Sequence, residues 1–234
     1  MLLSRTMICK GTLLAEKIGG AGDTRRPKPC LPTEINCFPA LAGTALRVIF
    51  PAMAILKIAR MGHPILATPA RAVSDPQAPE IRRLVNDMVE TMVDANGAGL
   101  AAPQVHVPLR IVVFQAPEGR TDPGLGEAER FDRTAPLTVL INPEIEMLGT
   151  ELEGGWEGCL SVPGLRGWVE RPDHIRYRGL GINGETIERV ARGFHARVVQ
   201  HECDHLDGRL YISRIGDLSR LIFESEIHHF QAAS

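Results

Sequence analysis

QHECDHLDG, residues 200 to 208, places two histidines and a glutamate close together, at His201, Glu202 and His205. Side chains four residues apart on an α-helix lie on the same face, one turn apart. If this segment is helical, both imidazoles can reach one metal ion, and Glu202 is a candidate acid-base group beside it. The motif supplies two ligands, whereas a hydrolytic metal ion normally takes three from the protein and keeps one position open for water.

The third ligand has three candidate sources in the sequence. An HExxHxxGxxH motif requires a histidine three residues beyond Gly208, where Tyr211 stands instead. A glutamate from a helix about twenty residues downstream is the second source, and Glu224 and Glu226 lie at that separation. The third source is Cys159 in the glycine-rich turn of GGWEGCLSVPG, since a thiolate binds first-row metals well. A free cysteine is usually a small buried hydrophobe, so residue type alone leaves the glutamates and the cysteine open.

The composition is that of an ordinary globular chain. It has 234 residues, of which 44% are hydrophobic and 23% charged, so it can bury a substantial core. The net charge is -2, with no basic cluster beyond Arg25, Arg26 and Lys28, which predicts no direct nucleic-acid partner. No apolar run approaches the roughly 18 residues of a membrane-spanning helix, so no membrane association is predicted. Five cysteines, without the spacing of a disulfide framework, favour a reducing compartment.

Residues 1–52 differ from the rest of the chain. They contain seven basic and three acidic residues, several prolines and glycines, and no sustained periodicity, so we expect a disordered extension. The extension is interpreted as an upstream stretch translated before a true start at Met53, or as an organelle-targeting segment, which is typically basic and acid-poor. A secretory signal fits less well, because Arg5 and Lys10 interrupt the apolar stretch. Residues 53–234 are then the folded domain.

The first half of this domain predicts one helix and two strands. Apolar residues recur at helical spacing between residues 78 and 95, and Asn96-Gly97 predicts the helix end. The residues at helical spacing are Ile81, Leu84, Val85, Met88, Met92 and Val93. Segments rich in β-branched residues predict strands at 109–116 and 137–142. The intervening stretch 117–136 is rich in proline, glycine and charge, and predicts a surface loop.

The second half predicts a hairpin and two helices. Strand-like segments flank Asn183-Gly184, which is the signal for a two-residue type I′ turn. Gly208 supplies the left-handed cap of the motif helix, and Asp217 is the predicted N-cap of a C-terminal helix over 217–231. The expected fold is α+β, with strands packed around a central helix that carries the HExxH motif and with a C-terminal helix.

GAGLAAPQ, residues 97 to 104, gathers small residues around one amide side chain. A ligand or another backbone can approach Gly99 closely, and Gln104 offers a hydrogen-bond donor. Alone, such a segment is also typical of a helix end and a tight turn. However, GAGLAAPQ, EGCLS at 157–161 and QHECDHLDG at 200–208, in this order, strongly resemble the three motifs of the peptide deformylase family. The resemblance extends over residues 53–234, which become a peptide deformylase-like catalytic domain.

This resemblance implies that Cys159, His201 and His205 bind one metal ion. An ion held by one thiolate and two neutral imidazoles carries a net charge of about +1, which still lowers the pKa of its water towards neutrality. The family commonly uses Fe²⁺, and Zn²⁺, Ni²⁺ or Co²⁺ can occupy the same site. Ligand type alone does not select among these ions, because affinity order and availability decide which one is bound.

The resemblance also implies catalytic roles for three further residues. Glu202 is the acid-base group, which accepts a proton during attack and passes it to the leaving amine. The side-chain amide of Gln104 and the backbone N–H of Leu160 are donors to the developing oxyanion, each worth about 3 kcal/mol.

Four residues are implied to meet or to shape the bound substrate. Gly99 and Leu100 offer backbone to an extended peptide by strand addition. Arg166, seven residues after Cys159, resembles a side chain that meets the substrate peptide. Arg197 lies one turn before His201, at a position expected to line the methionine pocket, and the sequence leaves its effect on that pocket open.

The implied function is hydrolysis of the N-formyl group from the initiator methionine of nascent polypeptides, with release of formate. The implied partners are N-formylmethionyl peptides, with the ribosome surface as a further candidate. The expected location is the cytoplasm, or a mitochondrion or plastid if residues 1–52 are a transit peptide. Two alternatives are an HExxH endopeptidase with Glu224 or Glu226 as third ligand, and a non-catalytic ribosome- or peptide-binding relative that keeps its metal for folding. A purely structural site needs neither Gln104 nor Glu202.

Overall fold

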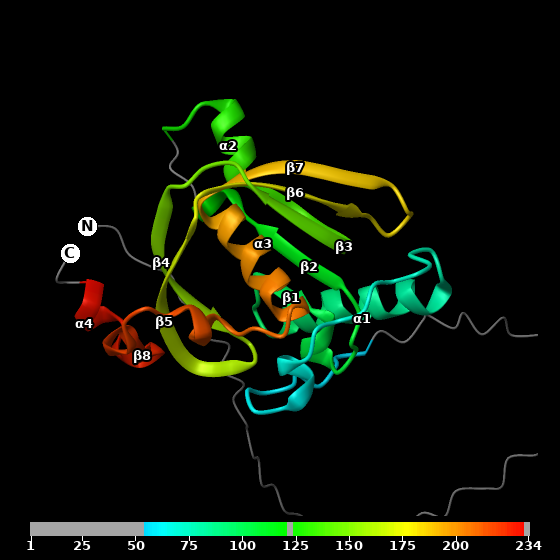
Figure 1. Ribbon diagram of the computed structural model, residues 1–234, viewed down its shortest axis with the longest axis horizontal. Helices are drawn as coiled ribbons and strands as arrows, with labels where there is room; N and C mark the ends of the chain where they lie inside the picture. The colour runs from blue at the N-terminus through cyan, green and yellow to red at the C-terminus, as the bar shows by residue number, and fades with distance from the viewer. Residues whose placement is uncertain (1–53, 121–123, 232–234) are drawn as a thin grey trace, which may run out of the picture. The chain divides into compact units, whose positions relative to one another are not determined.

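The computed structural model describes residues 54–120 and 124–231, so the interpretation of residues 1–52 lies outside the described residues. The fold is mixed α/β with two antiparallel sheets, of strand order β1-β2-β3-β6-β7 and β4-β5-β8 (Figure 1). The strands are β1 (Gly99–Ala101), β2 (Ile111–Ala116), β3 (Ala135–Met147), β4 (Leu152–Cys159), β5 (Val162–Pro172), β6 (His174–Leu180), β7 (Thr186–Arg192) and β8 (Leu221–Phe223). The α-helices are α1 (Pro79–Asp94), α2 (Glu127–Arg133), α3 (Gly193–Leu206) and α4 (His228–Gln231).

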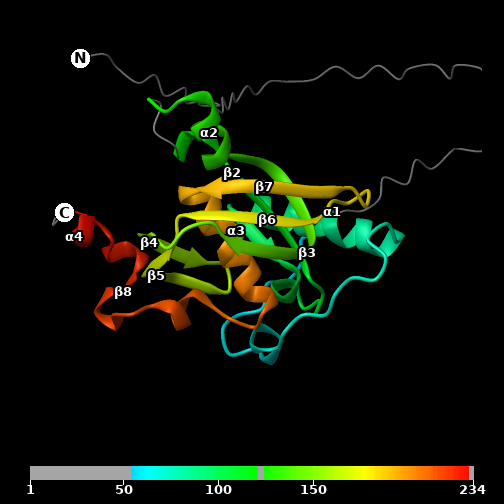
Figure 2. The same cartoon turned by 45° about the horizontal axis from the view of Figure 1, so that its top comes forward.

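The five-stranded sheet has an apolar core on each face. Successive side chains of a strand point to opposite faces, and β2 is buried on both. Val112 and Phe114 pack in one cluster with residues of α3, whereas Ile111 and Val113 pack in a second cluster with residues of α1. Helix α3 contacts β1, β2 and β7, and Figure 2 shows it beside the strands of this sheet. The sheet therefore provides a rigid support for α3.

Helix α1 ends where the sequence predicts. Asn96 has a left-handed φ of 53°, and the N–H groups of Asn96 and Gly97 donate to the carbonyls of Val93 and Met92 at 3.0 and 2.8 Å. This pair of bonds is a Schellman motif, which satisfies carbonyls at the helix end. The predicted end at Asn96-Gly97 is confirmed, but Val93 is 58% exposed and does not belong to the core face.

The hairpin of β6 and β7 is confirmed, but its turn is not the predicted type. Gly184 N–H donates to the carbonyl of Gly181 at 3.0 Å, and Gly181 N–H donates to that of Glu185 at 2.8 Å. The loop therefore has three residues, 182–184, and Gly184 alone takes the left-handed conformation, with φ 80°. A type I turn followed by a left-handed glycine is the usual three-residue hairpin loop.

The stretch 117–136 is not wholly a loop, because it contains α2. No residue of α2 is buried, so its sequence shows no apolar periodicity and predicts no helix. Glu127 and Glu129 lie in its first turn and Arg133 in its last, where each charge interacts favourably with the helix dipole.

Cys159 lies at the end of a strand instead of inside a glycine-rich turn. Strands β4 and β5 form a long hairpin in which Cys159 is paired with Val162, so the connecting turn is Leu160-Ser161. The glycines at 154, 155 and 158 hide the alternation that predicts strands, and neither strand of this hairpin was predicted from the sequence.

The predicted helix over 217–231 is wrong for most of its length. Asp217 accepts a hydrogen bond from Ser219 N–H at 2.9 Å, but it caps a 3₁₀ turn over Leu218–Arg220. Strand β8 follows and pairs with β5, then a 3₁₀ turn over Glu224–Glu226, and only the four residues of α4 are α-helical. A short apolar run fits a helix or a strand by spacing alone, and pairing with β5 decides for the strand.

Candidate metal centre

Helix α3 carries both histidines of the motif into the protein interior. His201 is 8% exposed, Glu202 3% and His205 0%. All three lie near the C-terminal end of α3, in a stretch of consecutive buried residues from 198 to 206. Ionisable side chains are rarely buried to this extent unless they are paired or bind a metal. A solvated helix face is therefore excluded for this motif.

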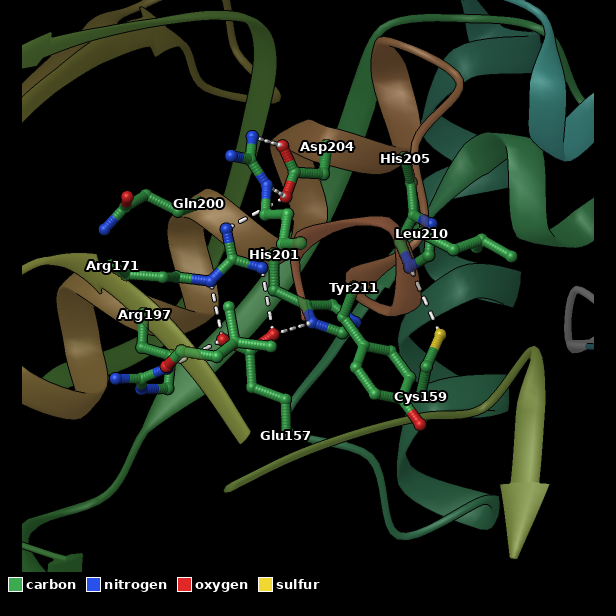
Figure 3. A network of polar contacts seen from close by, with 12 residues as sticks. Glu157, Cys159, Arg171, Arg197, Gln200, His201, Asp204, His205, Leu210 and Tyr211 are labelled. Atoms are coloured by element: carbon green, nitrogen blue, oxygen red, sulfur yellow. Dashed lines mark hydrogen bonds and ion pairs between the residues drawn. The ribbon is translucent and has the colours of Figure 1, made fainter. Parts of the chain in front are cut away.

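Cys159 is the third residue of the cluster. Its Sγ lies 3.3 Å from Nε2 of His205, as Figure 3 shows. The ligand atoms of Cys159, His201 and His205 all lie within 4.8 Å of one another, and no other such cluster of three occurs in the described part of the chain. The two glutamates considered as ligands point elsewhere, since Glu224 is bonded to Arg166 and Glu226 lies 3.5 Å from His229.

The donor set fits a divalent transition-metal ion. His201 donates its Nδ1–H to Oε2 of Glu157 at 2.8 Å, which fixes the tautomer with a lone pair on Nε2. The ring of Tyr211 stacks on that of His201, with centroids 5.9 Å apart, and so restricts its rotation. One cysteine sulfur and two imidazoles would supply three ligands to such an ion, which is the number that a catalytic metal centre normally takes from the protein.

Glu157 belongs to a buried charge network behind His201. Arg171 donates from Nε and Nη2 to the two oxygens of Glu157 at 2.5 and 2.9 Å, and both side chains are 3% exposed. Burial alone raises the pKa of Glu157, but its bonds with Arg171 and His201 outweigh this and hold that pKa well below its ordinary value. Glu157 is therefore ionised, and it holds the ring of His201 in place.

The network continues along α3 from His201 to Asp204, three residues farther on. Arg171, labelled in Figure 3 with Asp204, also donates from Nη1 to Asp204 at 2.9 Å. Asp204 accepts further bonds from Arg214. Asp204 therefore pairs with arginines and Asp207 with Arg110, and neither bonds to a ligand imidazole.

Sequence reasoning assigned no role to Glu157 or Arg171. Glu157 had a signal, because it is a charged residue inside a glycine-rich apolar segment two positions before Cys159. Arg171 had none, because its partners Glu157 and Asp204 are 14 and 33 residues away.

Glu202 is buried beside the three candidate ligands. Desolvation raises its pKa to about 7, and its Oε2 has no hydrogen-bond partner among the described residues. A Cβ atom on Gly99 would lie 2.6 Å from Cδ of Glu202. A group therefore does approach Gly99 closely, but it is the side-chain carboxylate of Glu202 and not the ligand or backbone that the sequence suggested. A buried carboxyl of near-neutral pKa with one oxygen free of hydrogen bonds is suited to accept and return a proton.

Gln104 and Leu160 both lie close to Cys159. The Gln104 side chain is 1% exposed and its Oε1 accepts the N–H of Ala101 at 2.8 Å. This bond turns Nε2 towards Cys159 Sγ, 3.4 Å away, and Ser161 Oγ, 3.1 Å away. Leu160 follows Cys159 directly and lines the same cavity as Gln104.

A cavity of about 530 Å³ opens over this cluster, within the usual range for small-ligand sites. Gly99, Arg166 and Arg197 line it together with the cluster residues. Leu100 does not line it, because its side chain is fully buried in the core beside α1. Strand β1, which contains Gly99 and Leu100, lies at the edge of its sheet and has one neighbour, β2, among the described strands.

Arg197 has its charge directed away from the open cavity. Nη1 donates to Glu157 and to the carbonyl of Val169, both at 2.8 Å, and Nη2 donates to the carbonyl of Glu153 at 2.6 Å. The charge is thus neutralised by Glu157, and the arginine contributes mainly its aliphatic stem to the cavity wall.

Two buried histidines on one helix, a thiolate and a neighbouring glutamate define the class of metal-dependent hydrolases. Residues 55–221 match the model of the polypeptide deformylase family. The chain is 54% identical over 165 residues to peptide deformylase 1 of Bordetella pertussis, which covers 70% of this chain and 89% of that protein. It is 48% identical over 168 residues to peptide deformylase 1 of Nitrosomonas europaea, with 71% and 90% covered.

A solved structure agrees. The Met-Ala-Ser-bound class I type b peptide deformylase of Acinetobacter baumannii is similar, with 37% identity and a TM-score of 0.61 over 70% of this chain and 99% of that one. The chain belongs to the peptide deformylase family, whose members are metal-dependent hydrolases that remove the N-formyl group from the initiator methionine of nascent polypeptides. This membership excludes the endopeptidase alternative, and the high identity to named peptide deformylases supports an enzyme over a non-catalytic relative. Among the described residues, no helix is long and apolar enough to cross a membrane.

Proposed function

We propose that Cys159, His201 and His205 bind one Fe²⁺ ion and that deformylation takes place in the cavity above them. The observation that carries this proposal is the convergence of one sulfur and two ring nitrogens within 4.8 Å. Zn²⁺, Ni²⁺ and Co²⁺ suit the same donors, and Fe²⁺ is proposed on the resemblance to the family. When bound, the metal lowers the pKa of water and polarises the formyl carbonyl.

Glu202 is proposed to carry the proton through the reaction. It accepts a proton from the attacking water and returns it to the amide nitrogen as the C–N bond of the formyl group breaks. The products are formate and the free amino group of methionine. A carboxyl whose pKa is raised by burial serves both steps, because it holds the proton neither too weakly nor too strongly near neutral pH.

Gln104 and Leu160 are proposed to stabilise the oxyanion that forms on the carbonyl. The Nε2 of Gln104 is held beside Cys159 by the bond from Ala101 N–H to its Oε1, so the donor is oriented before substrate binds. The Leu160 backbone N–H is the second donor. A preorganised donor of this kind is worth about 3 kcal/mol in the transition state.

The peptide is proposed to bind as an extended strand along β1. Gly99 and Leu100 then offer backbone groups at an open sheet edge, and Arg166 meets the peptide farther along. The A. baumannii relative binds Met-Ala-Ser, a peptide that begins with methionine. The aliphatic stem of Arg197 is proposed to form part of the wall of the methionine pocket.

Three further features belong to the same proposal. Helix α3 acts as the central element around which the strands of residues 53–234 hold the site. The chain works in the cytoplasm, where nascent chains emerge, with a mitochondrion or plastid as the alternative. Contact with the ribosome surface is tested by co-sedimentation, in which the chain stays in the supernatant if there is no contact.

The decisive experiment measures formate release from formyl-Met-Ala-Ser together with bound metal. Glu202→Gln keeps the metal and loses activity by at least about 10³-fold, since it removes the proton carrier and leaves the ligands in place. Cys159→Ala loses both metal and activity. Cys203→Ala is the matched control, because Cys203 is buried on α3 outside the cluster and burial raises the pKa of its thiol. An active, metal-bearing Cys159→Ala variant would refute the proposed centre.

A further inference from the structure

Arg166 and Glu224 form an ion pair at the rim of the cavity. Arg166 donates from Nε to Oε1 of Glu224 at 3.0 Å, and its Nη2 donates to the same oxygen. Both residues line the cavity above the candidate ligands. Strand β8 brings them together, because Ile222 is the register partner of Arg166 and Glu224 follows β8 directly. The C-terminal segment therefore contributes a charged side chain to the site.

This ion pair lies close to the reacting centre. A Cβ atom on Gly158 would be 2.7 Å from Nη1 of Arg166, so the guanidinium lies against the residue that precedes Cys159. Consecutive Cα atoms are about 3.8 Å apart, and an extended peptide advances about 3.3 Å per residue. The pair is thus within reach of the first residues that follow the methionine of a bound peptide.

The other acidic side chains of the cavity, Glu157 and Glu202, are buried. Glu157 is held by Arg171 and Arg197, and Glu202 is 3% exposed. By contrast, the side chains of Arg166 and Glu224 are 36% and 53% exposed. Exposed ion pairs add little to folding stability. We therefore expect this pair to act mainly through its charges on a bound ligand.

We propose that Glu224 is a specificity-determining residue for the peptide that follows the formyl-methionine. It neutralises Arg166, so the site accepts acidic and basic residues at positions 2 and 3 of the peptide nearly equally. Without Glu224, the charge of Arg166 is uncompensated and the site prefers acidic residues. Without Arg166, the charge of Glu224 is uncompensated and the preference reverses. This inference rests on the proposed deformylase site.

The test compares kcat/KM for two series of amidated peptides, formyl-Met-Xaa-Ser and formyl-Met-Ala-Xaa, with Xaa as Glu or Lys. In Glu224→Gln the ratio of the Glu to the Lys peptide rises about tenfold at one or both positions, mainly through KM, because charge steering acts on binding. In Arg166→Met the ratio falls. High salt reduces both shifts, since exposed charges are screened.

Glu226→Gln is the matched control. Glu226 has the same 53% side-chain exposure, lies two residues farther along and interacts with Ser225 and His229 instead of an arginine of the cavity. In Glu226→Gln the ratio of kcat/KM for the Glu peptide to that for the Lys peptide stays within about twofold of the wild-type ratio, because an exposed charge outside the cavity is largely screened. The inhibition constants of the unformylated amides Met-Ala-Glu and Met-Ala-Lys measure the same charge preference without turnover.

Each result decides the inference. An unchanged ratio in Glu224→Gln at both positions overturns it, and so does an equal shift in Glu226→Gln. A thermal midpoint of Glu224→Gln far below that of Glu226→Gln also overturns it, because the pair would then be structural. A wild-type protein that releases no formate from any of the peptides refutes the proposed function itself, and this outcome differs from an active enzyme without a charge preference.

Discussion

Gly99 lies against the carboxylate of Glu202, and this contact links the first motif of the sequence to the third. The absence of a side chain on Gly99 leaves room for this carboxylate, whose Oε2 has no hydrogen-bond partner among the described residues. Sequence reasoning recognised that something approaches this glycine but not which group. The identity of the neighbour depends on how β1 packs on α3.

Gly99→Ala is expected to lower deformylase activity by about 10²-fold, because a displacement of about 1 Å of a reacting group costs that much. The protein should still fold, since only a side-chain carboxylate has to move. Formate release and bound metal are measured in parallel, with metal content unchanged. Gly149→Ala is the control, because no atom lies within 4 Å of the added methyl group. Full activity of Gly99→Ala would show that the position of Glu202 is not critical.

At the scale of elements, α3 is tied to the β4–β5 hairpin by buried charges. Glu157 is on β4, Arg171 on β5 and Asp204 on α3, and all three are buried. Such a network is a weak source of stability, because desolvation offsets most of the attraction. Its effect is to fix the hairpin that carries Cys159 relative to the helix that carries His201.

Arg171→Met is expected to cost roughly 3–5 kcal/mol of unfolding free energy, because two carboxylates then lose their buried partner. Metal affinity should also fall, by about 10- to 100-fold, as the support of His201 weakens. Arg176→Met is the control, since Arg176 pairs with Glu146 at 3.0 Å with side chains 42% and 62% exposed. That variant should lose no more than about 1 kcal/mol. Denaturant titration measures the loss of unfolding free energy, and metal titration measures the loss of metal affinity. Equal losses in Arg171→Met and Arg176→Met would contradict the role of the network.

At the scale of the whole molecule, acid stability depends on a histidine in the core. His195 is fully buried and its Nδ1–H donates to the carbonyl of Asp132 at 2.8 Å. Its Nε2 then accepts from the hydroxyl of Tyr177 at 3.1 Å, a bond that only the neutral ring can make. The pKa of His195 is lowered to about 4, chiefly by desolvation; the bond to Asp132 opposes this shift, and the nearby charge of Arg189 adds to it.

The unfolded state therefore binds a proton at His195 at a higher pH than the folded state does. The contribution of neutral His195 to the unfolding free energy is complete above a pH of about 6.5 and is lost as the pH falls towards about 4. This contribution is on the order of 3 kcal/mol. Urea midpoints measured from pH 7 to 4.5 should fall less steeply in His195→Gln than in the wild type. The metal ligands are the same in both proteins, so the difference in slope isolates His195. His229→Gln changes an exposed histidine, so its urea midpoint should fall with pH as steeply as that of the wild type. Identical slopes in the wild type and both variants would contradict the role of His195 in acid stability.

The sequence by itself determined the local features: the i, i+4 histidines on one helix face, the end of α1 at Asn96-Gly97 and the left-handed cap at Gly208. These follow from interactions between residues a few positions apart, which a sequence pattern records directly. The family followed from three motifs in order, whereas the residues alone left Cys159, Glu224 and Glu226 open as the third ligand.

The tertiary structure decided everything that joins distant segments. It placed the sulfur of Cys159 beside His205, 46 residues away in the sequence. It also paired Arg166 with Glu224, and Arg171 with Glu157 and Asp204. It also turned the expected C-terminal helix into β8, because main-chain pairing with β5 outweighs the local preference of a short apolar run. No periodicity encodes such contacts, since they depend on how the β4–β5 hairpin and α3 pack together and not on spacing along the chain.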